Sequence, residues 1–125
     1  MAEPTEALIM EIEAAFNSRD VDRILSFFCE DGVFCTARGP TRTGIELRGK
    51  PAIGAFLRER FSHIPDMYWH PHFRFVSGDR GVSYWTVTGT DRRTGKALDL
   101  HGCDIFHFRD GRIAHKDTFW KTIEP

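Results

Sequence analysis

The sequence predicts an α+β fold in which three N-terminal helices pack against one face of a strongly curved, mostly antiparallel sheet. Apolar residues recur at helical spacing in the first half of the chain. Four long strand candidates, separated by short turns, follow in the second half. Helices first and an antiparallel meander afterwards are typical of α+β domains. The 125 residues suit a single domain spanning residues 1–125.

Three segments have the features of helices. Residues 5–17 place apolar side chains at the i, i+3 and i+7 positions of one helical face. Asp20 is a suitable N-cap for a second helix that runs to about Phe28. Pro51 fits the first position of a third helix, where its missing N–H costs nothing. The apolar residues predicted on the buried faces of the first and third helices are Ile9, Ile12, Phe16, Ile53, Phe56, Leu57 and Phe61.

Six segments are strand candidates. A short strand is expected at residues 33–36 and another at 45–48, on either side of a loop rich in Gly, Pro, Thr and Arg. Four longer strands follow, and Gly78, Gly95 and Gly111 mark the turns between them. These longer strands are expected at residues 68–76, 82–90, 97–108 and 112–122.

The final hairpin gives the best indication of a site. Asp110-Gly111 favours a type I′ turn, which would place Asp104 directly opposite Asp117. Opposed residues share one face of a sheet. Burying charge is costly unless the charge is paired or neutralised, so a plain core face would not carry two carboxylates and an imidazole. The residues predicted to line this face are Asp104, Phe106, Phe108, Ile113, His115, Asp117 and Phe119.

Two further registers extend this face across the sheet. A two-residue turn between the second and third long strands would pair Trp85 with Asp104. A four-residue connection between the first and second long strands would place His72 opposite Trp85 and Arg74 opposite Ser83, on the same face. A single β-bulge would invert part of this set. His70 and His72 have a spacing that metal sites use, but a site needs further ligands at close range, and no metal is predicted.

Composition and charge exclude several classes of function. The 17 basic and 18 acidic residues give a net charge of −1, so there is no broad cationic field for nucleic acid or an anionic membrane surface. No apolar run approaches the ~20 residues that span a bilayer, and the first residues lack the pattern of a signal peptide. Three cysteines without a C-x-x-C spacing are typical of a reduced, cytoplasmic protein.

Four segments, in their order and spacing, resemble the NTF2-like superfamily and, within it, the SnoaL-like polyketide cyclase group, which is related to ketosteroid isomerases. They are residues 16–20 (FNSRD), 28–34 (FCEDGVF), 48–53 (RGKPAI) and 103–113 (CDIFHFRDGRI). The resemblance implies a cone in which a bent sheet wraps around three helices and leaves a pocket at the open end. It also implies a site without a cofactor and dimers formed through the outer sheet face.

The resemblance also assigns expected roles residue by residue. Asp104 stands where ketosteroid isomerases carry an acid that donates a hydrogen bond to the developing oxyanion. The tyrosine and the base aspartate of those enzymes correspond to Ile12 and Thr36, which cannot substitute for them, so steroid isomerisation is not expected. Asp117 resembles the acid/base aspartate of SnoaL-type cyclases. The Arg-x-Asp pairing of limonene epoxide hydrolases is absent, because Gly102 stands two residues before Asp104.

These features together predict a cofactor-independent acid/base enzyme that acts on a small, largely apolar carbonyl compound by ring closure, isomerisation or dehydration. Asp117 would be the acid/base, Asp104 the oxyanion donor or proton partner, and His115 the residue that orients them. The alternative is a non-catalytic ligand-binding or protein-interaction domain. An open cleft would indicate a small ligand, and a closed cavity would indicate a structural or interaction role.

Other side chains are expected around the pocket and on the outer face. Arg38, Arg42 and Arg48 would either meet an anionic ligand at the pocket mouth or form a solvated basic loop. The residues expected to bind substrate are Trp85, Phe106, Phe119, His72 and Arg74. Alternation along the last strands predicts an outer face with an apolar patch, and such patches are typical of interfaces. The expected homodimer face comprises Cys103, Ile105, Lys116, Thr118 and Trp120.

Overall fold

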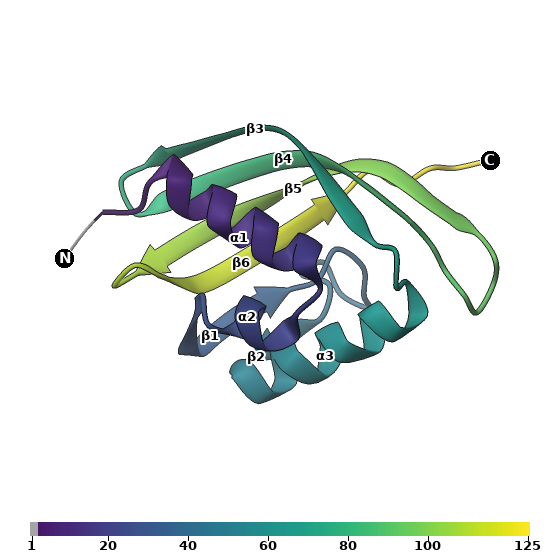
Figure 1. The fold of residues 1–125 in the computed structure, drawn as a ribbon, viewed down its shortest axis with the longest axis horizontal. Coiled ribbons are helices and arrows are strands. Elements are labelled where there is room, and N and C mark those ends of the chain that lie inside the picture. Colours follow the sequence, from purple (N-terminus) through teal and green to yellow (C-terminus); the bar gives the residue numbers. More distant parts are fainter. Residues whose placement is uncertain (1–2) are drawn as a thin grey trace.

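Three helices and a six-stranded sheet make up the computed structural model, which describes residues 3–125 (Figure 1). Residues 1–2, on which the predicted absence of a signal peptide partly rests, lie outside the described residues. The helices are α1 (Glu6–Ser18), α2 (Val21–Leu25) and α3 (Lys50–His63). The strands are β1 (Phe28–Cys35), β2 (Glu46–Arg48), β3 (Tyr68–Ser77), β4 (Arg80–Thr90), β5 (Ala97–Arg109) and β6 (Arg112–Trp120). The predicted α+β fold is confirmed.

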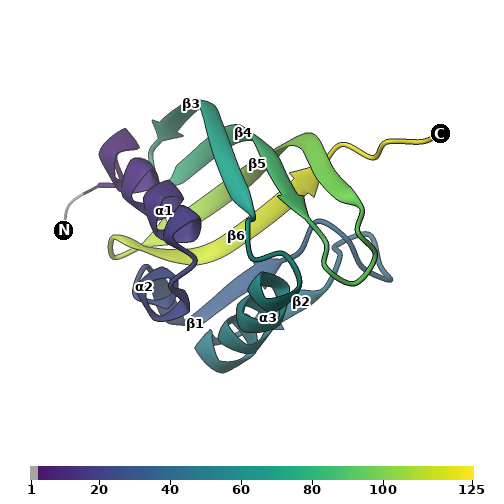
Figure 2. The same ribbon diagram turned by 45° about the vertical axis from the view of Figure 1, so that its right-hand side comes forward.

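The sheet has the strand order β2-β1-β6-β5-β4-β3, and its neighbouring strands are antiparallel except for the parallel pair β1 and β6. The helices lie on one side of this bent sheet, with α1 in front of the long strands and α3 beside β1 and β2 (Figure 2). The β4–β5 connection and the chain after β6 extend at the same end of the molecule (Figure 1). Within residues 3–125, no helix is long and apolar enough to cross a membrane.

Side-chain caps fix the beginnings of the first two helices. The Thr5 hydroxyl accepts a hydrogen bond from the backbone N–H of Leu8 at 3.1 Å. The Asp20 carboxylate accepts one from the backbone N–H of Arg23 at 3.2 Å, as the predicted N-cap requires. α2 is shorter than predicted because the chain joins the sheet early: Phe28 already pairs with β6, whereas the first strand was expected to begin at residue 33.

The last hairpin begins with the predicted turn. Asp110 and Gly111 have φ angles of 56° and 75°, which are the left-handed values that a type I′ turn needs. Phe108 pairs with Ile113, also as predicted. The register then shifts, because Ala114 is an additional residue on β6. Such a β-bulge moves every following side chain to the other face of the sheet.

The bulge corrects the predicted pairing of the two aspartates. Asp104 lies opposite Thr118, and Asp117 lies opposite Ile105. The two carboxylates therefore project from opposite faces of the sheet, and the prediction that they are cross-strand neighbours was wrong. The outer face holds His115, Asp117 and Phe119, whereas the inner face holds Lys116, Thr118 and Trp120.

A second bulge, in β3, moves His72 away from the predicted site. The register shifts between Pro71 and Phe73, which leaves His72 as the additional residue. The imidazole Nε2 of His72 lies 2.6 Å from Thr86 Oγ1, on the outer face. The prediction that His72 lies opposite Trp85 was therefore wrong.

The β4–β5 connection is longer than predicted, yet Trp85 and Asp104 remain on one face. Six residues connect the strands after Thr90, so Trp85 pairs with Gly102 and Asp104 with Ser83. The pairing differs from the predicted one by two residues. Because side chains alternate between faces with a period of two, an even shift leaves each residue on its predicted face.

Candidate functional site

A buried polar cluster centred on Asp104 lies on the inner face of the sheet. Asp104 is only 7% exposed. Its Oδ2 accepts a hydrogen bond from the Trp85 indole Nε1–H at 3.1 Å. Its Oδ1 accepts one from the Thr118 hydroxyl at 2.6 Å and lies 2.9 Å from the Lys116 ammonium. Both carboxylate oxygens therefore have partners, as a buried charge requires.

Lys116 is the cation of this cluster and is itself 4% exposed. Its ammonium donates to Thr118 Oγ1 at 2.7 Å and lies 4.0 Å from the ring centre of Phe34 and 4.8 Å from that of Phe16. Burial lowers the pKa of the Lys116 ammonium, and the negative charge of Asp104 acts against this effect. Lys116 therefore gives up a proton more readily than an exposed lysine does.

A second buried carboxylate, Glu13, projects from α1 toward the same interior. The Arg74 guanidinium donates from Nε to Glu13 Oε1 at 3.0 Å, and its Nη2 lies 2.9 Å from the same oxygen in an ion pair. The Ser83 hydroxyl donates to Glu13 Oε2 at 2.6 Å. Arg74 lies opposite Ser83, as predicted, but its guanidinium is occupied by Glu13.

The space between these two clusters is small. An internal cavity of about 20 Å³ lies among their side chains, which is room for about one water molecule. No organic ligand fits there. The cavity is lined by Ile12, Glu13, Phe16, Trp69, Trp85, Asp104, Phe106 and Lys116.

A much larger cleft opens at the end of the molecule where the β4–β5 connection and the chain after β6 extend. Its volume is about 1510 Å³, enough for a ligand of several rings. Its walls come from residues 36–45, the second half of α3, residues 91–100 and residues 117–123. We call this space the mouth cleft.

Thr118 connects the mouth cleft with the buried cluster. Thr118 lines the cleft, and its hydroxyl holds hydrogen bonds to both Asp104 and Lys116. Thr118 therefore belongs both to the wall of the cleft and to the network of the buried ion pair. The Thr118 oxygen accepts from Lys116 and retains a second lone pair for a donor on a ligand.

The structure divides the predicted site residues between the two faces. Asp104, Trp85 and Phe106 line the internal cavity. The predicted grouping of Asp104 with Asp117 and His115 was wrong, because the bulge at Ala114 separates them. Phe119 is 48% exposed on the outer side, and His72 lies there as well. Asp117 and Phe119 also border the mouth cleft.

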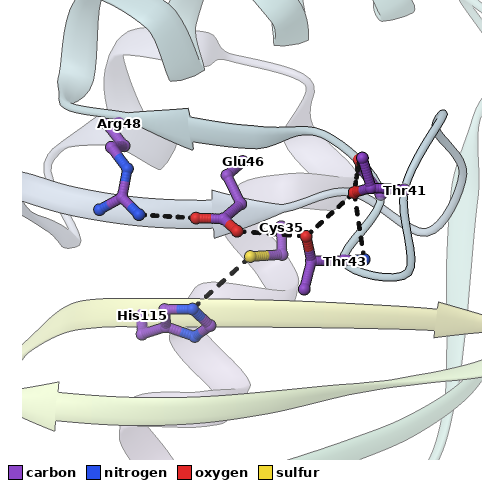
Figure 3. A network of polar contacts seen from close by, with 7 residues as sticks. Cys35, Thr41, Thr43, Glu46, Arg48 and His115 are labelled. Carbon is purple, nitrogen blue, oxygen red and sulfur yellow. Dashed lines mark hydrogen bonds and ion pairs between the residues drawn. The ribbon is translucent and has the colours of Figure 1, made fainter.

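The outer-face residues form their own contacts beside the loop that follows β1. His115 Nε2 lies 3.6 Å from Cys35 Sγ (Figure 3). Burial raises the pKa of the Cys35 thiol, and the charge of Asp117 raises it further. Cys35 is therefore a poor nucleophile. Burial also raises the pKa of the Asp117 carboxyl, although the neighbouring His115 opposes this effect.

Hydrogen bonds hold the loop at the rim of the mouth cleft. Thr43 donates to Glu46 Oε2 at 3.1 Å, and Glu46 Oε1 lies 2.6 Å from Arg48 Nη2 (Figure 3). The Thr36 hydroxyl accepts from the backbone N–H of Ile45 at 2.9 Å. Arg48 is therefore paired with Glu46 on β2, and it does not line the cleft.

Sequence reasoning missed four residues of this site. Glu13 follows Ile9 by four positions and so lies on the buried stripe of its helix, which is a readable signal. Arg60 stands in the same relation to Phe56 on α3. Lys116 and Thr118 were assigned to the outer face, because nothing in the sequence marks the bulge before them. Within residues 3–125, no cluster of His, Cys, Asp and Glu side chains is suited to hold a metal ion.

The chain is similar to known proteins over most of its length. Residues 11–116 match the SnoaL-like domain family. A putative polyketide cyclase from Xanthomonas campestris pv. campestris superposes with a TM-score of 0.82 at 23% identity, over 93% of this chain and 89% of that one. An NTF2-like protein of unknown function from Burkholderia pseudomallei gives 0.81 at 24% identity, with the same coverage. TerC, co-crystallised with polyporic acid, superposes with a TM-score of 0.78 at 24% identity, over 93% of this chain and 90% of that one. No curated protein matches the chain.

Proposed function

The chain belongs to the SnoaL-like group of the NTF2-like superfamily, a small-molecule-binding fold, and we propose that it catalyses cofactor-independent acid/base chemistry on a small, largely apolar carbonyl compound held in the mouth cleft. One observation carries the proposal: Thr118 lines the cleft, and its hydroxyl holds hydrogen bonds to the buried Asp104 carboxylate and the buried Lys116 ammonium. Cyclisation, isomerisation and dehydration of carbonyl compounds all require a proton to move at an oxygen next to the reacting carbon.

The proposed proton path runs through Thr118. The enol O–H of a bound ligand donates to Thr118 Oγ1, and the hydroxyl proton of Thr118 passes to Asp104 Oδ1 over the 2.6 Å hydrogen bond. Water in the open cleft supplies the proton that joins the ligand carbon, and Asp104 later returns its proton to water. Lys116 stabilises the charge on the relay by its contact with Thr118 Oγ1 at 2.7 Å.

The three residues first predicted to be catalytic keep only part of their proposed roles. Asp104, expected to be an oxyanion donor or proton partner, is proposed as the proton acceptor. Asp117 borders the cleft, and its raised pKa would let it exchange protons with a ligand at the rim. His115 would influence Asp117 by its charge, not by contact with Asp104.

A second candidate function is non-catalytic ligand binding. The complete pairing of Asp104 favours it, because a carboxylate held by Lys116, Thr118 and Trp85 also serves the fold alone. Under this alternative the mouth cleft binds its ligand and the cluster only keeps the core in register.

Hydrogen–deuterium exchange of 2-tetralone in D₂O separates these two candidates. A catalyst that converts an enol to a ketone also accelerates the reverse enolisation. Enolisation in D₂O replaces the α-protons by deuterium, so loss of their NMR signal measures the catalysed proton transfer. Saturation transfer from the protein to the ketone reports on binding in the same sample. We expect binding together with accelerated exchange, and a rate lower by about 100-fold in Asp104→Asn. Binding without acceleration would establish the non-catalytic alternative.

Homodimer formation and a cytoplasmic location are further proposals. Three cysteines are free, which suits a reducing compartment. Ile105 and Cys103 lie on the outer face as predicted, but Trp120 lies on the inner face, so its assignment to the interface was wrong. Apolar side chains that are about half exposed take its place beside Ile105: they are Phe73, Phe75 and Phe119.

A further inference from the structure

We propose that the mouth cleft selects ligands that carry an anionic oxygen, such as a carboxylate, and that Arg60 and the Trp120 indole N–H hold that group. The inference rests on the proposed function, because it specifies the charge of the ligand bound in the same cleft. It depends on the surroundings of three side chains that line the cleft: Arg38, Arg60 and Trp120.

Arg60 is a cation without a carboxylate partner. It lies in the last turn of α3, and its guanidinium carbon is 4.6 Å from the ring centre of Phe56 and 5.1 Å from that of Trp120. None of the ion pairs formed within residues 3–125 includes Arg60. Aromatic faces hold a guanidinium in place but leave its N–H groups free to donate.

The charge of Arg60 is disfavoured in the unliganded cleft. Removal from water and, to a smaller extent, the positive charge of Arg38 lower the pKa of Arg60 to about 10. Two of the four carboxylates that line the cleft have partners of their own: Glu59 lies 3.6 Å from His63, and Asp91 lies 2.9 Å from Arg93. An anion between Arg38 and Arg60 would remove this repulsion and supply the missing counter-charge.

Trp120 contributes a second free donor at the same place. Its indole Nε1 is buried and has no hydrogen-bond partner among residues 3–125. A buried donor without an acceptor is destabilising, and such groups are uncommon in folded proteins. The guanidinium of Arg60 lies over the Trp120 ring, so the two free donors belong to side chains in direct contact.

The overall charge of the cleft supports the same ligand. Six lysine and arginine side chains line it, against four acidic ones, although the whole chain has a net charge of −1. The aromatic rings of Phe56 and Trp120 add flat apolar surface beside the cations. This combination fits a planar, apolar ligand with an acid at one end.

A matched pair of probes tests the inference: 2-naphthoate and 2-naphthamide share one ring system and differ in charge. Titration calorimetry gives both affinities, and the ¹⁵N-labelled indole signal of Trp120, assigned with Trp120→Phe, reports the contact. We expect naphthoate to bind at least about 10-fold more tightly than the amide and to shift the Trp120 indole signal. In Arg60→Leu, and in the second variant Arg60→Met, the preference should disappear.

Arg58→Leu is the matched control on the same helix, because Arg58 is paired with Asp22 at 2.8 Å and does not line the cleft. It should keep the preference for naphthoate. Equal affinities for the two probes, or an unchanged preference in both Arg60 variants, would overturn the anion inference. If 2-tetralone exchange persisted in that case, the proposed function would stand. Binding of neither probe, with no binding of 2-tetralone, would overturn both.

Discussion

The hydroxyl of Thr118 donates to Asp104 Oδ1 at 2.6 Å, across the two strands of the final hairpin. The contact exists because the bulge at Ala114 places Thr118 opposite Asp104. Without the bulge, Asp117 would occupy that position and two carboxylates would meet in the core. The additional residue therefore replaces a repulsive pair by a hydrogen-bonded network that includes a cation, Lys116.

Removing the charge of Asp104 should destabilise the fold. Asp104→Asn leaves Lys116 buried without its counter-charge, and breaking a buried pair in this way costs about 3–5 kcal/mol. Urea denaturation measures the loss. The double variant Asp104→Leu with Lys116→Met removes both charges and should recover more than half of it. A double variant no more stable than Asp104→Asn would show that the ion pair is not the source of the loss.

Stability should rise with pH in the alkaline range because of Lys116. The ordinary lysine pKa is 10.5, and burial lowers that of Lys116 in the folded state. Between the lowered value and 10.5 the unfolded chain binds the proton that the folded chain has released, so the free energy of unfolding increases with pH. The difference between wild type and Lys116→Met, measured by urea denaturation across this range, isolates the effect. A pH-independent difference would contradict it.

Asp117 should titrate above the ordinary aspartate value of 3.8. Burial raises the pKa of Asp117 in the folded chain. Between pH 3.8 and that raised pKa, the folded chain holds a proton that the unfolded chain has lost. The contribution of Asp117 to the free energy of unfolding therefore falls as pH rises through this range. Carbon-detected NMR of the aspartate carboxyls gives the value directly. A pKa at or below 3.8 would show that Asp117 is solvated and would remove its proposed exchange with a ligand.

The outer sheet face should carry the dimer contact. Phe119→Glu or Ile105→Glu places a charge among side chains that are about half exposed there and should shift the protein toward monomer in sedimentation at micromolar concentration. Met10→Glu, at a similarly exposed position on α1, should leave the dimer intact. A wild-type monomer, or dimers unaffected by either outer-face change, would place the contact elsewhere or exclude it.

The sequence predicts the face of each strand residue correctly only where no β-bulge intervenes. Periodicity and turn residues predict the helices, the final turn and the inward position of Asp104, because an even shift of register preserves the face of each side chain. The positions of Lys116 and Thr118 depend on one unpaired residue, Ala114, whose type carries no bulge signal. Glu13 and Arg60 were readable in principle, since both interrupt an apolar helical stripe.

The exchange rate of 2-tetralone in a pair of Thr118 variants tests the proposed relay most directly. Thr118→Ser keeps the hydroxyl between Asp104 and Lys116, whereas Thr118→Val keeps the shape and removes it. We expect Thr118→Ser to retain most of the catalysed exchange and Thr118→Val to lose about 100-fold, while saturation transfer shows the ketone bound to both. Equal exchange rates in the two variants, with the ketone bound, would contradict the relay through Thr118.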